Sequence, residues 1–390
     1  MDGVCREATP LLGMPRIMTR RDRRPEALVL DEDILREGAV CEFGGELAVE
    51  ACGGVAVTPW RDRFRAAEAA ELTVKSDSSE LEDASFSQVI VHLQKSRAAT
   101  FTDLAEAWRI LQPGGQLLFC GTNALGVTSA VKRLAKELDQ TPIIISNRAR
   151  ARVVRFKRGD GPGPEPETTP TYEASITAID GTHHEWTMET RPGVFSAKKL
   201  DAGTELLLAC LPGYIGHKPP KRIVDIGCGT GIFGIAAAIL YPEVECLLVD
   251  GDARAIACAR ANVARLGLSE RVTVEWWDAR EQPLGDRFNL ALVNPPFHQQ
   301  GADVDLGPAL ALFASLWTWL GRNGRGLIVA NQTLPWEGPL GEVGPVELLD
   351  STKGYKLLSL KRSARPPGSR GRKSPDKRSS GSMKFPTRSR

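Results

Sequence analysis

The chain has 390 residues, which is enough for two globular domains of ordinary size. Hydrophobic residues make up 42% of it and charged residues 25%, a balance that predicts a folded protein and argues against disorder over most of the length. It contains no run of about 18 uninterrupted apolar residues and no apolar block near its start, so we expect neither a membrane protein nor a secreted one. The eight cysteines are scattered without a C-x-x-C pair. We therefore expect a cytoplasmic protein without disulfides and without a bound metal.

The net charge of +2 conceals a strong asymmetry along the chain. Residues 361–390 contain eleven Lys or Arg and one acid, Asp376, so this tail carries +10 and the rest of the chain −8. The tail is also rich in Pro, Gly and Ser and has almost nothing to bury, which predicts disorder. Its charge fits a solubilising extension as well as an arm that contacts a phosphate backbone, and charge alone does not decide between them.

Strands and helices alternate in both halves of the chain. In the first half we expect a strand at 86–91, a helix at 101–111 and a strand at 116–120. Residues 159–171 hold four Pro and three Gly and predict a linker between a domain at 20–158 and another at 172–360. The second half predicts helices at 202–211, 232–240, 253–266 and 309–320, and strands at 222–226, 245–250, 272–276, 290–293 and 327–330. This alternation is typical of an α/β fold with a mostly parallel sheet and helices on both faces.

The two halves also resemble each other in sequence. FSQVIVH at 86–92 matches FNLALVN at 288–294, and the glycine turn at 111–123 resembles the segment at 320–331. Any two βα units with a glycine turn look somewhat alike, but we favour a duplication that gives two Rossmann-like domains in tandem.

A glycine-rich turn follows the strand expected at 222–226. Asp225 precedes Gly227, Gly229 and Gly231, and the turn leads into a helix. Glycines at these positions let the backbone turn tightly and leave room for a ligand beside the N–H groups of the helix start. The spacing differs from the G-x-G-x-x-G of pyrophosphate binding, so a cofactor without phosphates is favoured over NAD.

Two more carboxylates end the next two strands. Asp250 lies where a carboxylate can accept both hydroxyls of a ribose, whereas Asp252 is the better N-cap for the helix that follows. Asp278 comes after the third strand. It either receives the amine of an adenine or is an exposed loop acid.

The segment Asn294-Pro295-Pro296-Phe297-His298 directly follows the strand at 290–293. Because the two prolines fix an extended backbone, the side chain of Asn294 and the carbonyl of Pro295 offer two acceptors at the strand edge. The amine of a nucleobase has two N–H donors and a flat ring, which match these acceptors and the ring of Phe297. An amide is no general base, so catalysis here would consist of orienting the amine for attack on a methyl group.

With these motifs the chain resembles the class I S-adenosylmethionine-dependent methyltransferases, and among them the ribosomal RNA guanine-N2 methyltransferases with a "methyltransferase small" domain. The resemblance covers roughly residues 80–360 and implies S-adenosylmethionine as the cofactor. His298-Gln299-Gln300 is similar to the branch of the family directed to 23S rather than 16S RNA. Family motifs imply that the cofactor contacts Asp225, Gly227, Gly229, Gly231, Asp250, Asp278, Asp201 and Gly203, that Asn294, Pro295 and Phe297 are catalytic, and that Pro296 and His298 contact substrate.

The first half departs from this pattern at the positions that carry chemistry. The segment at 41–45 lacks the triple-glycine spacing, Thr58 stands where Asp250 would be needed, and His92 takes the place of Asn294. We therefore expect a degenerate domain that binds no cofactor, and the resemblance implies that it helps to hold RNA. Candidate phosphate contacts, which fit a solvated charged face equally well, are Lys95, Arg97, Lys132, Arg133, Arg148, Arg150 and Arg152.

These observations predict an enzyme that methylates the exocyclic N2 of a guanine in ribosomal RNA, with the RNA or a ribosomal subunit as partner and a monomeric state. The same acceptor pair would serve N6 of adenine or a protein glutamine, although Tyr is commoner there in place of Phe297. An NAD-dependent oxidoreductase would need the longer glycine spacing. A non-catalytic RNA-binding protein would not require Asp225, Asp250 and Asn294 on one sheet edge.

Overall fold

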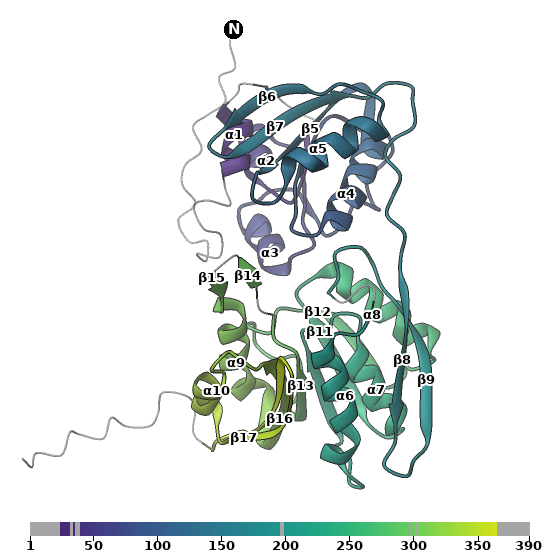
Figure 1. The fold of residues 1–390 in the computed structure, drawn as a ribbon, viewed down its shortest axis with the longest axis vertical. Coiled ribbons are helices and arrows are strands. Elements are labelled where there is room, and N and C mark those ends of the chain that lie inside the picture. The colour runs from purple at the N-terminus through teal and green to yellow at the C-terminus, as the bar shows by residue number, and fades with distance from the viewer. Residues whose placement is uncertain are drawn as a thin grey trace, which may run out of the picture.

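Short apolar strands and the helices between them build two separate sheets, one in each half of the chain (Figure 1). The structure is a computed structural model and describes residues 24–31, 34–35, 40–195, 199–296, 298–300 and 303–364. The tail predicted to be disordered lies outside these residues from position 365 onward.

The first sheet has seven strands in the order β3-β2-β1-β4-β5-β7-β6. All neighbours are parallel up to β5, and β7 runs antiparallel to both β5 and β6. Its strands are β1 (Val40–Phe43), β2 (Val55–Val57), β3 (Val74–Lys75), β4 (Phe86–His92), β5 (Leu111–Thr122), β6 (Ile143–Arg148) and β7 (Ala151–Lys157). The helices of this half are α1 (Arg24–Asp31), α2 (Leu47–Cys52), α3 (Arg61–Ala69), α4 (Arg97–Ile110) and α5 (Val127–Glu137).

The second sheet repeats this topology strand for strand, in the order β12-β11-β10-β13-β16-β18-β17. The strands are β10 (Arg222–Ile226), β11 (Glu245–Asp250), β12 (Val272–Trp276), β13 (Phe288–Val293), β16 (Leu320–Asn331), β17 (Val346–Thr352) and β18 (Tyr355–Lys361). The helices are α6 (Ala202–Ile215), α7 (Ile232–Leu240), α8 (Ala253–Arg265), α9 (Gly307–Trp319) and α10 (Glu337–Val343). Two small hairpins complete this half, β8 (Thr171–Thr177) with β9 (His183–Glu189) and β14 (His298–Gln300) with β15 (Asp303–Asp305). The prediction of two tandem α/β domains is confirmed.

The fifth strand of each sheet is longer than the sequence predicted. β5 was expected at 116–120 and β16 at 327–330, but each begins several residues earlier, within the glycine turn. Both copies start pairing with the fourth strand there, Leu111 with Phe86 and Leu320 with Phe288, and both then shift register. A turn that also pairs as a strand is missed by periodicity, because its residues do not alternate.

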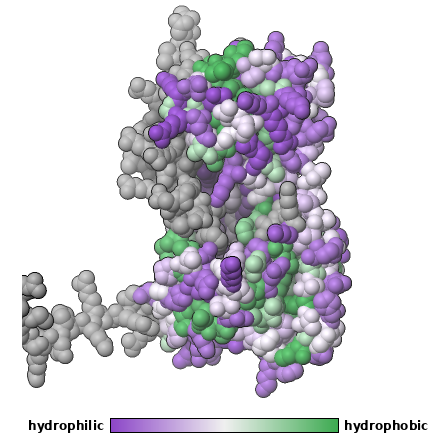
Figure 2. Space-filling model, viewed as in Figure 1, coloured by the Kyte–Doolittle hydropathy of each residue, from purple (hydrophilic) through white to green (hydrophobic). Residues whose placement is uncertain are grey.

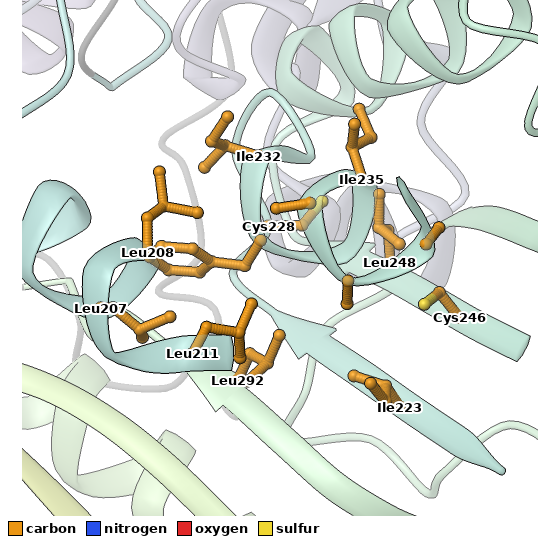
Figure 3. Close-up of a cluster of buried hydrophobic side chains, with 14 of the residues drawn as sticks. Leu207, Leu208, Leu211, Ile223, Cys228, Ile232, Ile235, Cys246, Leu248 and Leu292 are labelled. Atoms are coloured by element: carbon orange, nitrogen blue, oxygen red, sulfur yellow. The ribbon is translucent and has the colours of Figure 1, made fainter. Parts of the chain in front are cut away.

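Apolar side chains from helices and strands close the second core beneath the glycine turn. Leu211 of α6 lies beside Leu292 of β13, and Leu208 extends toward the side where Ile232 lies (Figure 3). The β8–β9 hairpin adds Trp186 and Met188 to the same core, and residues 158–170 before it form no helix or strand. This packing fixes the strand ends on which the site is built.

The two halves meet through the segment that leads into α3, which lies at the lower edge of the first domain in Figure 1. The N–H of Arg61 donates to the Gly251 carbonyl and the N–H of Ala253 donates to the Pro59 carbonyl, both at 2.8 Å. The guanidinium of Arg61 pairs with Glu281 at 2.6 Å and lies 4.3 Å from the ring centroid of Trp277. The first domain therefore contacts the second directly after β11 and β12.

The last strand of the second sheet leads directly into the basic segment. β18 runs to Lys361, and the Arg362 guanidinium lies 3.8 Å from the ring centroid of Trp317 and donates to the Trp317 carbonyl at 2.8 Å. The first cations of the predicted basic tail thus belong to the folded domain. None of the helices in the described part of the chain is both long and apolar enough to cross a bilayer.

We expect Arg61→Ala to loosen the contact between the domains. The substitution removes the ion pair with Glu281 and the contact with Trp277, which together should cost about 1–3 kcal/mol because Arg61 is largely buried. Scanning calorimetry of the full chain would register this as a lower Tm. Lys75→Ala is the matched control, since its partner Glu80 is exposed and the pair should contribute at most about 0.5 kcal/mol. An unchanged Tm for Arg61→Ala would contradict this role.

Candidate cofactor and catalytic site

The glycine turn after β10 bends back over the end of β11. The N–H groups of Gly227 and Cys228 donate to the Val249 carbonyl at 2.9 and 3.0 Å. All three glycines have positive φ, at 71° for Gly227, 55° for Gly229 and 90° for Gly231, a conformation that side chains disfavour. A Cβ at Gly227 or Gly229 would meet no atom within 4 Å, whereas one at Gly231 would come within 2.8 Å of Leu248. The first two glycines therefore keep a ligand-facing surface open, and the third allows close packing.

Asp225 lies beneath this turn and is 1% exposed. Its Oδ2 accepts the N–H of Gly234 at 3.0 Å, while its Oδ1 is buried without a hydrogen-bond partner among the described residues. Burial raises the pKa of Asp225 to about 7, with a smaller contribution from the charge of Asp250. One carboxylate oxygen is thus a buried acceptor without a donor among the described residues.

Asp250 stands on the neighbouring strand end. Its Oδ2 accepts the N–H of Gly229 at 2.9 Å and its Oδ1 accepts the N–H of Asp252 at 2.8 Å. Burial raises its pKa to about 6, and the charge of Asp252 adds to this. Each oxygen retains a second lone pair. Asp252 itself is the N-cap of α8, as the sequence predicted.

The carboxylate of Asp278 already accepts hydrogen bonds from the protein, whereas an adenine amine requires an open acceptor. Its Oδ1 accepts from the backbone N–H of Arg280 at 2.9 Å and from the Nε of the same residue at 2.8 Å. Arg280 also reaches Asp62 of the first domain at 3.2 Å. Asp278 therefore organises a turn that faces the first domain, and a role toward adenine would have to use its remaining lone pairs.

Asn294 follows β13 and is tied to the first turn of α6. Its Nδ2 donates to the Thr204 hydroxyl at 3.4 Å, and that hydroxyl donates to Asp201. Asp201 is the N-cap of α6, because its Oδ1 accepts the N–H groups of Gly203 and Thr204 at 3.0 and 3.2 Å. A Cβ at Gly203 would come within 2.7 Å of the Tyr355 ring, so glycine is required there for packing.

The rest of the loop after β13 is only partly described. Pro295 is buried and Pro296 is exposed. Phe297 lies outside the described residues, and His298 is described only by its backbone in β14. The structure thus brings Asp225, the glycines, Asp250, Asp201 and Asn294 to one edge of the sheet, and Asp278 to the adjoining turn.

The equivalent place in the first domain is filled by its own side chains. The strand registers put Glu42 at the position of Asp225 and Thr58 at that of Asp250, and His92 stands at that of Asn294. Oε1 of Glu42 lies 2.7 Å from Nε2 of His92, and Sγ of Cys120 lies 3.1 Å from Nδ1. Burial disfavours the charged form of His92, but Cys120 and Glu42 together raise its pKa well above the ordinary value.

Three features of the site are not among the sequence predictions. Glu42 is the counterpart of Asp225, and the signal for it is the alignment of its strand with that of Asp225 rather than any glycine motif. Thr204 lies in an apolar helix without any motif of its own, and nothing in the sequence marks its contact with Asn294. Arg254, which pairs with Asp252 at 2.8 Å and donates to Gln94 of the first domain at 3.2 Å, is visible only in the fold.

Among the candidate phosphate contacts, Lys95, Lys132, Arg148 and Arg150 are exposed. Arg133 is also exposed, but it forms ion pairs with Glu137 and Glu167 at 2.6 and 2.8 Å and lies over the Phe101 ring. In the described ranges, no group of three or more His, Cys, Asp or Glu residues could hold a metal ion.

These residues fit S-adenosylmethionine. The unpaired Oδ1 of Asp225 suits the ammonium of its methionine part, and the free lone pairs of Asp250 suit the ribose hydroxyls. The open surface over Gly227 and Gly229 admits a ligand at the strand ends.

The strand order and this site define a class I methyltransferase fold, and comparisons with known proteins agree. The model of the methyltransferase small domain matches residues 185–359. Ribosomal RNA small subunit methyltransferase C of Shewanella halifaxensis is 31% identical over 75% of this chain and 82% of that protein. The Klebsiella pneumoniae protein of the same name is 30% identical over 69% of this chain and 74% of its own length. The chain belongs to the ribosomal RNA small subunit methyltransferase C family.

A solved structure has the same fold over nearly the whole chain. It is the T. thermophilus 16S rRNA N2 G1207 methyltransferase in complex with AdoMet and guanosine. It superposes with a TM-score of 0.76 at 23% identity and covers 88% of this chain and 93% of its own. Both domains, and not only the second, therefore share the architecture of that enzyme.

Asp225→Asn should separate stability from ligand binding. The folded-state pKa of Asp225 is about 7, which is above the ordinary value of an aspartate. The ionised carboxylate therefore destabilises the ligand-free fold, and the free energy of unfolding falls as pH rises from about 4 through 7. At pH 8 the variant should therefore melt roughly 2–4 °C above the unsubstituted protein without ligand. Its affinity for S-adenosylmethionine, measured by calorimetry, should fall about tenfold or more.

Asp286→Asn is the control for this substitution, since Asp286 has an exposed carboxylate. It should change neither the Tm nor the affinity. If Asp225→Asn bound the ligand as tightly as the original chain, the assignment of Oδ1 to the ligand would be wrong.

Proposed function

We propose that the chain transfers a methyl group from S-adenosylmethionine to the exocyclic N2 of a guanine in the RNA of the small ribosomal subunit. Membership of the family supports the reaction and the class of RNA. The observation that carries the proposal is the placement of Asn294 at the end of β13, beside the glycine turn and with its Nδ2 already engaged by Thr204.

The cofactor would be held by Asp225, Asp250 and the open face of the turn at Gly227 and Gly229. When bound, it supplies a methyl group activated by a sulfonium. The chain contributes two buried carboxylates. Their raised pKa values reflect the free-energy cost of keeping a negative charge in this site without a counter-charge. An ammonium placed against Asp225 would offset part of this cost.

Asn294 would act on the amine of the guanine. With Nδ2 bonded to Thr204, Oδ1 is directed away from α6 and accepts one N–H of the amine, while the Pro295 carbonyl accepts the other. Accepting both hydrogens directs the nitrogen lone pair along the line of attack. The amide takes up no proton, so the proton released on methylation leaves to water.

The substrate base must be unpaired to reach this sheet edge, because N2 is inaccessible within a stacked duplex. The first domain would hold the neighbouring RNA. Hydrophilic side chains cover much of its visible face in Figure 2, and the exposed cations Lys95, Lys132, Arg148 and Arg150 would contact phosphates.

The relatives act on the small subunit by name, whereas His298-Gln299-Gln300 resembles the 23S-directed branch. We choose 16S RNA, because similarity over more than two thirds of the chain outweighs three residues.

An enzyme for ribosomal RNA would work in the cytoplasm, and we propose that it acts as a monomer. The relatives named above are methyltransferases, which argues against an NAD-dependent oxidoreductase and against a non-catalytic RNA-binding protein.

Asn294→Ala should leave the affinity for S-adenosylmethionine within about threefold and lower turnover about a hundredfold or more, because it removes one acceptor of the amine. Asn289→Ala is the matched control, since this asparagine lies on the same strand and bonds the Arg222 N–H at the other end. It should retain nearly full turnover. If Asn294→Ala and the control had equal turnover, the loop would have no catalytic role.

Mass spectrometry of ribosomal RNA from cells with and without the protein would identify the product. We expect one N2-methylguanosine in 16S RNA to disappear and to return with the purified chain. Loss of a methyladenosine, or of a methylated protein glutamine, would instead favour the alternatives that share the same acceptor pair. A lost mark in 23S RNA would overturn the choice of subunit.

A further inference from the structure

The first turn of α6 carries a buried threonine next to the catalytic loop. Thr204 is 5% exposed, and its hydroxyl lies between the carboxylate of Asp201 and the amide of Asn294. We infer that Thr204 is a positioning residue that sets the orientation of the Asn294 amide, an inference that rests on the proposed function.

The Asp201 carboxylate decides where the hydroxyl hydrogen of Thr204 lies. An ionised carboxylate only accepts hydrogen bonds, so the Thr204 hydroxyl must donate its single hydrogen to Asp201 Oδ2. The hydroxyl then faces Asn294 with lone pairs alone. It can accept from Nδ2, at 3.4 Å, but has no hydrogen left to donate to Oδ1.

This arrangement distinguishes the two orientations of the amide, which differ only by a rotation that exchanges oxygen and nitrogen. With Nδ2 toward Thr204 this hydrogen bond forms, and Oδ1 lies on the other side of the amide. In the opposite orientation Oδ1 would meet the lone pairs of Thr204, and Nδ2 would face the substrate. An amide nitrogen has no acceptor for the hydrogens of an amine, so only the first orientation serves catalysis.

The anchor of this chain of contacts is rigid. Asp201 caps α6 through two backbone N–H groups, and Gly203 packs so closely on Tyr355 that a methyl group would come within 2.7 Å of the ring. The leucines of the next turn are buried against β10 and β13. A hydroxyl fixed in this way directs the amide before the substrate arrives, which lowers the cost of reaching the reactive geometry.

The test uses the full chain, S-adenosylmethionine with a radiolabelled methyl group, and 16S RNA from cells that lack the protein. Thr204→Val keeps the shape of the side chain and removes the hydroxyl. It should lower kcat about 10- to 100-fold while the cofactor Kd stays within about threefold. Thr204→Ser restores the hydroxyl and should return kcat to within about threefold of the original.

A double variant separates positioning from a general structural effect. If Thr204 acts only through Asn294, then adding Thr204→Val to Asn294→Ala should change kcat less than about twofold. Thr190→Val is the control for loss of a buried hydroxyl, because Thr190 bonds the Pro170 carbonyl instead. It should keep its kcat even if its Tm falls.

Three results would overturn the inference. Thr204→Val could keep the kcat of the original chain, or Thr204→Ser could fail to restore it. Adding Thr204→Val to Asn294→Ala could also lower kcat by the same factor as Thr204→Val does alone. The proposed function fails separately, since it requires Asn294→Ala itself to be slow. A slow Asn294→Ala beside a fast Thr204→Val would reject the positioning role alone.

Discussion

The site depends on a carboxylate that is buried before anything binds to it. Asp225 has one oxygen bonded to Gly234 and the other without a partner among the described residues, and burial is the main cause that raises its pKa to about 7. Burying a carboxylate with one oxygen unpaired costs free energy, which the surrounding core must supply. Above it, the glycine turn leaves open space at Gly227 and Gly229, where a Cβ would meet no atom within 4 Å. With the proposed contact to the cofactor, binding and stability are opposed at this residue.

In the first domain, side chains fill the place that corresponds to the site of the second. Glu42 occupies the position of Asp225 and accepts the N–H of Ala48 at 2.8 Å, as Asp225 accepts that of Gly234. Its extra methylene carries the other oxygen to His92, which stands where Asn294 would be. A Cβ at Gly45 would come within 2.5 Å of Glu42 and 2.7 Å of His92, so the space over the strand ends is taken. Closing the pocket needed no change in strand order.

Local sequence patterns predicted most of the second sheet and its glycine turn. β10, β11, β12 and α7 have the predicted bounds, and the acids and glycines after these strands meet at one edge because parallel strands end together. Contacts between distant segments could not be read in the same way. Arg61 reaches Glu281 across 220 positions, and Asn294 reaches Thr204 across 90. Such pairs leave no periodicity, and an arginine or a threonine has many ordinary roles.

The contact between the domains has a consequence for how these proteins diverge. Pro59, Arg61, Gly251 and Ala253 join through main-chain donors and acceptors, next to the strand end that carries Asp250. Every residue type supplies the same carbonyl, and all but proline supply the same N–H. Mutations at this contact can therefore replace the side chains while the main-chain hydrogen bonds between the two domains persist. Homologues with little sequence similarity at these positions would still inherit the same relative orientation of the two domains.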